Sequence, residues 1–110
     1  MEFKKTIAVD FDGVFNNYTG YDPKDLGTPK KGIHEFIEQL AREYTIIVHS
    51  RRDPVMIRRW LRENDLDENI RAVTEWKPAA VAYIDDRAVR FDGDYDECLE
   101  RVTDKAYWQK

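Results

Sequence analysis

Cysteine is almost absent from this chain of 110 residues, which contains only Cys98. A single cysteine excludes a disulfide framework within one chain, and it excludes a zinc site built from several cysteines. Cys98 lies in the segment DYDECLERV, at a position that would face inward on a helix. We therefore expect it to be a core residue rather than a reactive thiol.

Net charge and long apolar runs are also scarce. The 18 basic and 22 acidic residues leave a formal charge of −4, so bulk charge gives no support to general nucleic-acid binding. No apolar run approaches the ~18 residues of a membrane span, and the N-terminal MEFKK has no long apolar segment behind it. These features predict a cytoplasmic location and no membrane partner.

The chain does contain enough apolar residues for a folded domain, at 42% of the sequence, and its length predicts a single domain over residues 1–110. Hydrophobic patterns predict strands at 4–10, 45–49, 70–73 and 81–84, an edge strand at Arg90 and Phe91, and helices at 32–42, 54–64 and 95–102. This alternation is typical of the α/β class. It predicts a three-layer, Rossmann-like, mostly parallel sheet with helices on both faces.

A long loop separates the first strand from the first helix. Residues 11–31 are rich in glycine, asparagine and proline, and loops of this length in compact domains are usually functional. We expect Phe15 and Tyr18 to form a partial lid that stacks on a base or another ring. This expectation fails if both rings are buried under the sheet, away from Asp10.

Polar side chains of a restricted kind follow the predicted strands. They are Asp10 and Asp12 after the first strand, Ser50 and Arg51 after the second, and Lys77, Asp85 and Asp86 around the last. The carboxyl ends of parallel strands meet at one edge of a sheet, where ligands bind. Four carboxylates at one place repel each other unless a cation lies among them. An all-oxygen ligand set suits Mg²⁺, and a hydroxyl with a lysine suits phosphate oxygens.

These residues carry a family resemblance. The segment DFDGV, Ser50 after TIIVH, Lys77, and the pair Asp85–Asp86 after VAYI are similar, in order, to the four motifs of the haloacid dehalogenase (HAD) superfamily of phosphatases. The resemblance spans residues 7–87. It implies a HAD-like hydrolase in which Asp10 is the nucleophile and forms an aspartyl-phosphate, and in which Asp12 is first the general acid and then the general base.

The same resemblance implies the remaining roles. Ser50 and Lys77 would bind the transferring phosphoryl group. Mg²⁺ would be held by Asp10, Asp85 and the main-chain carbonyl of Asp12. Asp86 would not contact the metal directly and would orient a metal-bound water or Lys77. Arg51 is our own addition to the phosphate-binding set, because it directly follows Ser50.

Many members of this family insert a cap domain after the first or second motif. The gaps from Asp12 to Ser50 and from Ser50 to Lys77 are too short for one, so the resemblance is to the small capless type. An open site suits a bulky phosphorylated substrate, or a second subunit of a homo-oligomer that covers it. We therefore expect a Mg²⁺-dependent phosphomonoesterase acting on nucleotides or on phosphorylated nucleic-acid ends.

Other interpretations stay open at this point. The substrate can instead be a sugar phosphate, or the chain can be a non-catalytic phosphate-binding or regulatory module on the same fold. A receiver domain of a signalling system is disfavoured, because no strand-terminal aspartate precedes Ser50 where such a domain needs its phosphoacceptor. Each residue also has a purely structural interpretation, such as a turn at Asp12, a helix cap at Ser50 or a surface lysine at Lys77.

Overall fold

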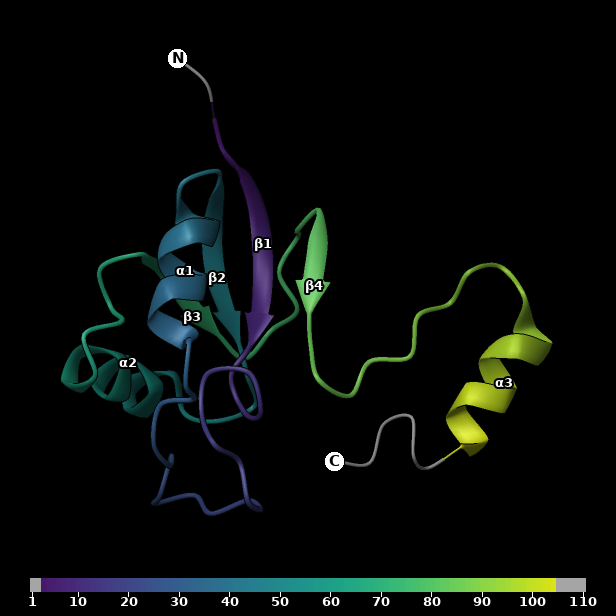
Figure 1. The fold of residues 1–110 in the computed structure, drawn as a ribbon, viewed down its shortest axis with the longest axis horizontal. Helices are drawn as coiled ribbons and strands as arrows, with labels where there is room; N and C mark the ends of the chain where they lie inside the picture. Colours follow the sequence, from purple (N-terminus) through teal and green to yellow (C-terminus); the bar gives the residue numbers. More distant parts are fainter. Residues whose placement is uncertain (1–2, 105–110) are drawn as a thin grey trace.

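A parallel sheet forms the centre of the computed structural model, which describes residues 3–104. Its four strands lie in the order β3-β2-β1-β4, and every neighbouring pair is parallel (Figure 1). The strands are β1 (Lys5–Asp10), β2 (Tyr44–His49), β3 (Ile70–Thr74) and β4 (Ala82–Ile84). The helices are α1 (Ile33–Ala41), α2 (Pro54–Glu63) and α3 (Tyr95–Thr103).

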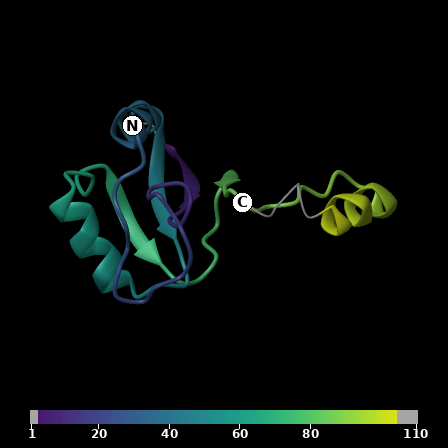
Figure 2. The same cartoon turned by 60° about the horizontal axis from the view of Figure 1, so that its bottom comes forward.

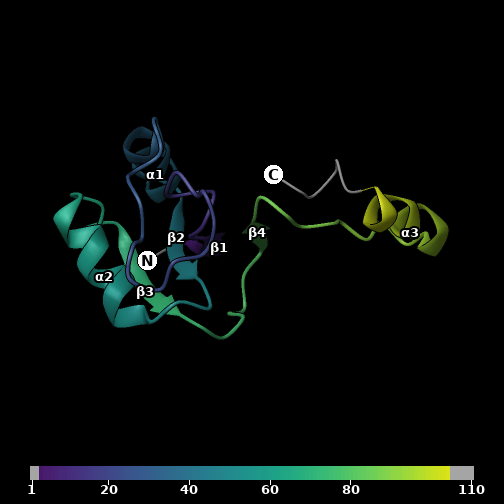
Figure 3. The same ribbon diagram turned by 90° about the horizontal axis from the view of Figure 1, so that it is seen from below.

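One face of the sheet carries the hydrophobic core. Alternate residues of a strand point to the same face, and the register pairs Ile7 with Ile46 and Val9 with Val48. All four side chains are buried and belong to one core cluster. Helices α1 and α2 cover this face, since α1 contacts β2 and α2 contacts β3. Figure 3 looks at the sheet from the carboxyl ends of its strands and shows both helices on the same side.

Helix α2 begins where the sequence predicts. The Asp53 side chain accepts a hydrogen bond of 2.9 Å from the backbone N–H of Val55, and Pro54 occupies the first helical position. Both features are typical of helix N-termini. The cap matters for function because it fixes the short turn between Ser50, at the end of β2, and the helix.

The loop of residues 11–31 is anchored rather than free. Phe11, Phe15 and Leu26 are buried in the core, and Phe15 stacks on Phe11 with ring centroids 5.9 Å apart. The prediction that Phe15 contributes to a lid is therefore wrong. Tyr18, by contrast, is 38% exposed.

The C-terminal part of the described chain departs from the expected layers. α3 has no contact with any strand or with α1 or α2 within residues 3–104, and Figures 1 and 2 show it standing apart from the sheet. Its charged side chains bind the preceding linker instead, since Arg101 pairs with Asp92 at 3.2 Å. Cys98 is half-buried on a helix without buried residues, so its prediction as a core residue is wrong. The predicted edge strand at Arg90 and Phe91 is also absent.

The predicted fold class is confirmed, because the structure is a Rossmann-like α/β fold with an all-parallel sheet and, in residues 3–104, no cap domain. Its helices differ from the expectation in one respect, since the two that contact the sheet share one face. None of the described helices is long and apolar enough to cross a membrane. The ends of β1, β2 and β4 lie at one edge of the sheet, where the predicted polar residues follow them (Figure 3).

Candidate functional site

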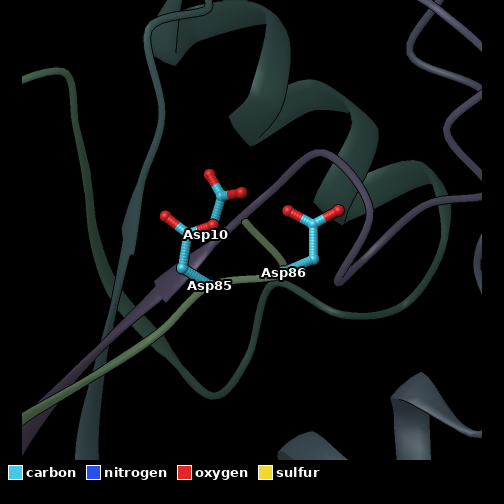
Figure 4. A group of neighbouring side chains, drawn as sticks. All are labelled: Asp10, Asp85 and Asp86. Carbon is cyan, nitrogen blue, oxygen red and sulfur yellow. The ribbon is translucent and has the colours of Figure 1, made fainter. Parts of the chain in front are cut away.

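Three aspartates meet at the carboxyl edge of the sheet. Asp10 is the last residue of β1, and Asp85 and Asp86 directly follow β4, which pairs with β1. One carboxylate oxygen of each lies within 4.8 Å of the other two. Figure 4 shows the three carboxylates side by side, projecting to the same side of the chain. We call Asp10, Asp85 and Asp86 the aspartate cluster.

The cluster is electrostatically unfavourable without a cation. Burial, and then the charge of Asp85, raise the pKa of Asp10 from 3.8 to about 7. The same two causes, in the same order, raise the pKa of Asp86, although Arg87 acts in the opposite direction. Among residues 3–104, no ion pair reaches any of the three carboxylates. Their mutual repulsion is therefore uncompensated by protein cations in direct contact.

Two further observations fit a metal ion. The Oδ1 atom of Asp86 is buried and has no hydrogen-bond partner, and a buried carboxylate oxygen without a partner is costly. Gly13 lies so close that a Cβ at this position would be 2.1 Å from Asp86 Oδ2. The glycine thus leaves room for the Asp86 carboxylate to enter the cluster. Three carboxylate oxygens are ligands that suit Mg²⁺, with water and substrate oxygens completing the coordination.

The geometry adds Asp86 to the residues that could hold a metal ion, since one of its carboxylate oxygens lies within 4.8 Å of those of Asp10 and Asp85. That Asp86 instead orients a metal-bound water or Lys77 stays a prediction. The Asp12 carboxylate is outside the cluster. That Asp12 binds metal through its main-chain carbonyl stays a prediction.

The Asp12 side chain is held by two partners that the sequence interpretation missed. The Nε of Arg52 donates to Asp12 Oδ2 at 2.9 Å and to Oδ1 at 3.0 Å. Asn16 Nδ2 donates to the same Oδ1 at 3.0 Å. Arg52 is 5% exposed and Asn16 is 1% exposed, so both are fixed by their surroundings, and they fix Asp12 in turn.

Asn16 also shapes the backbone around the cluster. Its Oδ1 accepts a hydrogen bond of 2.8 Å from the Gly13 N–H, and its Nδ2 donates to the Leu26 carbonyl at 2.7 Å. One buried side chain therefore connects the turn after β1, the carboxylate of Asp12 and the far end of the loop. Nothing in the sequence pattern distinguishes Asn16 from an ordinary turn residue.

Ser50 and Arg51 lie where the sequence predicts, in the same cleft as Asp10. The backbone N–H of Ser50 donates to the Thr74 carbonyl at 3.0 Å, and Ser50 Oγ accepts from the Arg52 N–H at 3.2 Å. These bonds leave the hydroxyl hydrogen available for a ligand. The cleft has a volume of about 390 Å³ and is lined by Asp10, Asp12, Tyr18, Tyr21, Ser50, Arg51, Arg52 and Arg87. We call it the Asp10 cleft.

Lys77 does not line this cleft. Its Nζ lies 4.7 Å from the ring centroid of Tyr83, and Tyr83 is in register with Ala8, before the carboxyl ends of β1 and β4 where the aspartates lie. The side chain is therefore directed to the sheet face next to β4. Arg87 lines the cleft instead, so Arg87 and Arg51 are the exposed cations there. Arg87 directly follows the Asp85–Asp86 pair in the sequence, and this position could have indicated that Arg87 lines the site.

A slightly larger hollow, of about 450 Å³, lies beside α1 and the loop after α2, with His34, Glu38 and Asp65 among its lining residues. We assign the site to the Asp10 cleft because Asp10 joins it to the aspartate cluster, the group of residues 3–104 in which three carboxylates converge.

Comparisons with known proteins give one structural relative. A conserved protein from Bacteroides thetaiotaomicron has a similar fold, with a TM-score of 0.62 and 25% sequence identity over 94% of this chain and 93% of that chain. No family model and no curated protein matches the sequence. The similarity supports the fold and carries no statement of activity.

Proposed function

We propose that this protein is a HAD-like, Mg²⁺-dependent phosphomonoesterase that acts through an aspartyl-phosphate on Asp10. The observation that carries the proposal is the aspartate cluster with its buried, unpartnered Asp86 oxygen. Three carboxylates at the end of a parallel sheet, beside a serine and two exposed arginines, fit a metal ion together with a phosphate group.

A bound divalent cation would keep Asp10 in its nucleophilic form. With a pKa near 7, Asp10 is protonated in about half of the metal-free molecules at neutral pH, and a protonated carboxyl group is a poor nucleophile. A divalent cation held by Asp10, Asp85 and Asp86 would favour the ionised carboxylates and neutralise charge on the phosphate.

In the first step, an oxygen of Asp10 attacks phosphorus and the bond from phosphorus to the leaving oxygen breaks. Asp12 gives its proton to the leaving oxygen. In the second step, Asp12 takes a proton from water while the water oxygen attacks phosphorus, so that inorganic phosphate leaves and Asp10 is regenerated. Ser50 and Arg51 contact the phosphoryl oxygens during both steps.

The contacts of Asp12 support this role only in that they hold its side chain in one orientation. Arg52 and Asn16 fix its carboxylate from two directions, and a positioned acid transfers its proton more effectively than a mobile one. Arg51 and Arg87 are the proposed phosphate-binding cations, because both line the Asp10 cleft, whereas the Nζ of Lys77 lies over the ring of Tyr83. Cytoplasmic location and homo-oligomerisation stay predictions.

The test is release of p-nitrophenol from p-nitrophenyl phosphate with Mg²⁺, with EDTA and after Asp10→Asn. Asp96→Asn is the matched control, because Asp96 lies in the first turn of α3, away from the cleft. We expect activity that needs Mg²⁺, is abolished by Asp10→Asn and is unchanged by Asp96→Asn. Activity that persists in EDTA or in Asp10→Asn would overturn the proposal. Mg²⁺ binding without turnover of any phosphomonoester would instead support a phosphate-binding module.

A further inference from the structure

The face of the sheet opposite α1 and α2 carries no helix in the part of the chain that the structure describes (Figure 3). The residues in register across this face, one from each strand, are Ala72, Ile47, Ala8 and Tyr83. None of the four belongs to the hydrophobic core cluster or packs against it, because neighbouring residues of a strand point to opposite faces. We call these four residues the open face. Parallel sheets are ordinarily covered on both faces, so this fold lacks one layer.

The open face is apolar and shallow. Ala8 and Ala72 lie on either side of Ile47, which is half-buried, and Tyr83 is 45% exposed at the end of the row. Val81, which points to the same side as Tyr83, extends the apolar surface and is also exposed. Burial of such surface is favourable, at roughly 25 cal/mol per Å². Small side chains beside a larger one would let a covering helix approach closely.

Helix α3 has an apolar side that needs a covering surface. Tyr95 and Leu99 lie one turn apart on this side and are 80% and 61% exposed. The helix is capped, since Asp94 accepts hydrogen bonds from the backbone N–H groups of Asp96 at 2.9 Å and Glu97 at 3.2 Å. A helix of nine residues is nevertheless marginal in water without packing. We therefore expect α3 to be stabilised by a surface that buries Tyr95 and Leu99.

The linker before α3 is bound to α3 itself. Arg101 NH1 donates to the Arg90 carbonyl at 3.1 Å, and Arg101 pairs with Asp92 at 3.2 Å. The ring of Phe91 packs on that of Tyr95, with centroids 4.9 Å apart, and this unit stands away from the sheet (Figures 1 and 2). A tethered helix has an effective concentration in the millimolar range at its own sheet, so a helix that fitted there in this arrangement would already be docked. The covering surface therefore belongs to another molecule.

A second copy of the chain offers a surface that matches α3. Lys77 lies over the ring of Tyr83 at the border of the open face, and Glu100 follows Leu99 on α3. Neither Lys77 nor Glu100 forms an ion pair within residues 3–104, so docking would bring two unpaired opposite charges to one contact. A nine-residue helix is about 13–14 Å long, comparable to the width of four strands spaced ~4.8 Å apart. The two surfaces thus agree in apolar character, charge and length.

We propose that α3 docks on the open face of a second copy, and that the α3 helix of the second copy docks in return. Each copy supplies one helix and one face, so the exchange closes with twofold symmetry, and exchange of an identical element is a low-cost route to a dimer. The docked helix supplies the missing layer of each sheet. This inference is independent of the proposed phosphomonoesterase activity, because it uses neither the Asp10 cleft nor the aspartate cluster.

The test is the mass of the full chain in solution, measured by analytical ultracentrifugation. The wild type should sediment with twice the chain mass of 13.1 kDa. Leu99→Lys and Tyr83→Glu should each weaken the dimer by roughly tenfold or more, because each places a charge in an apolar contact. Val55→Lys is the matched control and should leave the dimer unchanged, since Val55 is 64% exposed on α2, away from the open face.

Mixing the two weakened variants separates helix exchange from other dimers. In a mixed dimer, the unaltered α3 of the Tyr83→Glu chain meets the unaltered open face of the Leu99→Lys chain, and the second contact joins the two introduced charges, which are opposite. The mixture should therefore form more dimer than either variant alone. A wild type of single chain mass, a dimer that Leu99→Lys does not weaken, or a mixture without recovery would overturn the proposal.

A cross-link shows which sheet α3 covers and leaves Tyr83 and Leu99 unaltered. Cys98 lies on α3 and is the single cysteine of the chain, and Val81→Cys adds a second thiol beside the open face. A short bismaleimide should join position 81 of one copy to Cys98 of the other and give a covalent dimer. The wild type, treated in the same way, is the control. A link within one chain would show that α3 folds back on its own sheet, and this result, like the absence of any link, would overturn the exchange.

Discussion

Gly13→Ala perturbs the aspartate cluster without changing any charged residue. Gly13 has a φ of +85°, and a Cβ there would lie 2.1 Å from Asp86 Oδ2 and 2.8 Å from Asp86 Cγ. These distances are far below van der Waals contact, so the Asp86 carboxylate must move away. We expect the variant to keep Asp10 and Asp85 in place and to lose the third carboxylate of the proposed metal site.

The matched control Gly32→Ala separates the cost of the left-handed backbone from the effect of displacing Asp86. The left-handed backbone conformation costs an alanine about 1–2 kcal/mol of folding stability, and Gly32→Ala pays the same cost. Gly32 has a φ of +90°, and a Cβ there meets nothing within 4 Å. Only Gly13→Ala adds the displacement of a metal ligand, which we expect to weaken Mg²⁺ binding by roughly 10–100-fold or more.

The assay is Mg²⁺ binding by calorimetry, supported by the rise of Tm with Mg²⁺ concentration, which follows the ratio of free ligand to Kd. Both variants should fold and show similar Tm values in EDTA. Gly32→Ala should bind Mg²⁺ like the wild type, and Gly13→Ala should bind it much more weakly. Equal affinity in the two variants would refute the assignment of Asp86 as a ligand.

Three further predictions follow from the contacts around Asp10 and Asp12. In EDTA, the free energy of unfolding should fall as pH rises from about 4 to 7, because the pKa of Asp10 is 3.8 when unfolded and about 7 when folded. The full shift corresponds to about 4 kcal/mol. Solvent screening of this half-buried group reduces the expected change to roughly 1–2 kcal/mol. Chemical denaturation across this range measures it, and saturating Mg²⁺ should flatten the slope. Arg52→Lys should lower kcat roughly tenfold or more for an alkyl phosphate and much less for p-nitrophenyl phosphate, because only the poor leaving group needs a well-positioned Asp12. Asn16→Ala should destabilise the fold by about 1–3 kcal/mol in denaturant titrations, whereas Asn17→Ala, at an exposed site, should cost less than about 1 kcal/mol.

A specific result would contradict each of these three predictions. A stability that rises between pH 4 and 7 in EDTA would show that Asp10 is not held in an unfavourable environment. Equal losses for the two phosphate esters in Arg52→Lys would indicate a general structural role rather than positioning of Asp12. An Asn16→Ala protein as stable as Asn17→Ala would mean that the buried amide bonds do not organise the loop.

The sheet and the position of its acidic residues could be predicted from the sequence. Contiguous apolar runs such as Ile7–Val9 are typical of strands in parallel sheets, and parallel strands end at one edge. That geometry alone brings Asp10 and Asp85 together. The helices with strong apolar periodicity, α1 and α2, were predicted to within two residues at each end.

The side-chain contacts within the site could not be predicted in the same way. Whether Asp86 faces the cluster depends on the space beside Gly13, and the direction of Lys77 depends on the ring of Tyr83. Asn16 and Arg52 have roles only through partners distant in the sequence, since Arg52 binds a carboxylate 40 residues away. The local sequence pattern indicates periodicity and turns, but it contains no information on contacts between residues that are distant in the sequence.

The last helix shows a different limit. Its apolar positions predicted a helix that packs on the sheet, and the helix forms at Tyr95–Thr103. Its distance from the sheet is set by the linker after Asp86 and by contacts such as that of Arg101 with Asp92. An amphipathic pattern predicts that a helix has a side to bury, but it does not specify the partner surface.

The central claim is that Asp10 itself becomes phosphorylated, and chemical trapping tests it most directly. The Asp12→Asn variant, treated with p-nitrophenyl phosphate and Mg²⁺, should accumulate the intermediate, because this good leaving group needs no acid while hydrolysis of the intermediate needs a base. Borohydride reduction followed by peptide mass analysis should then find homoserine at position 10. Turnover by the wild type with no trapped label at position 10, or with label at another residue, would contradict the account.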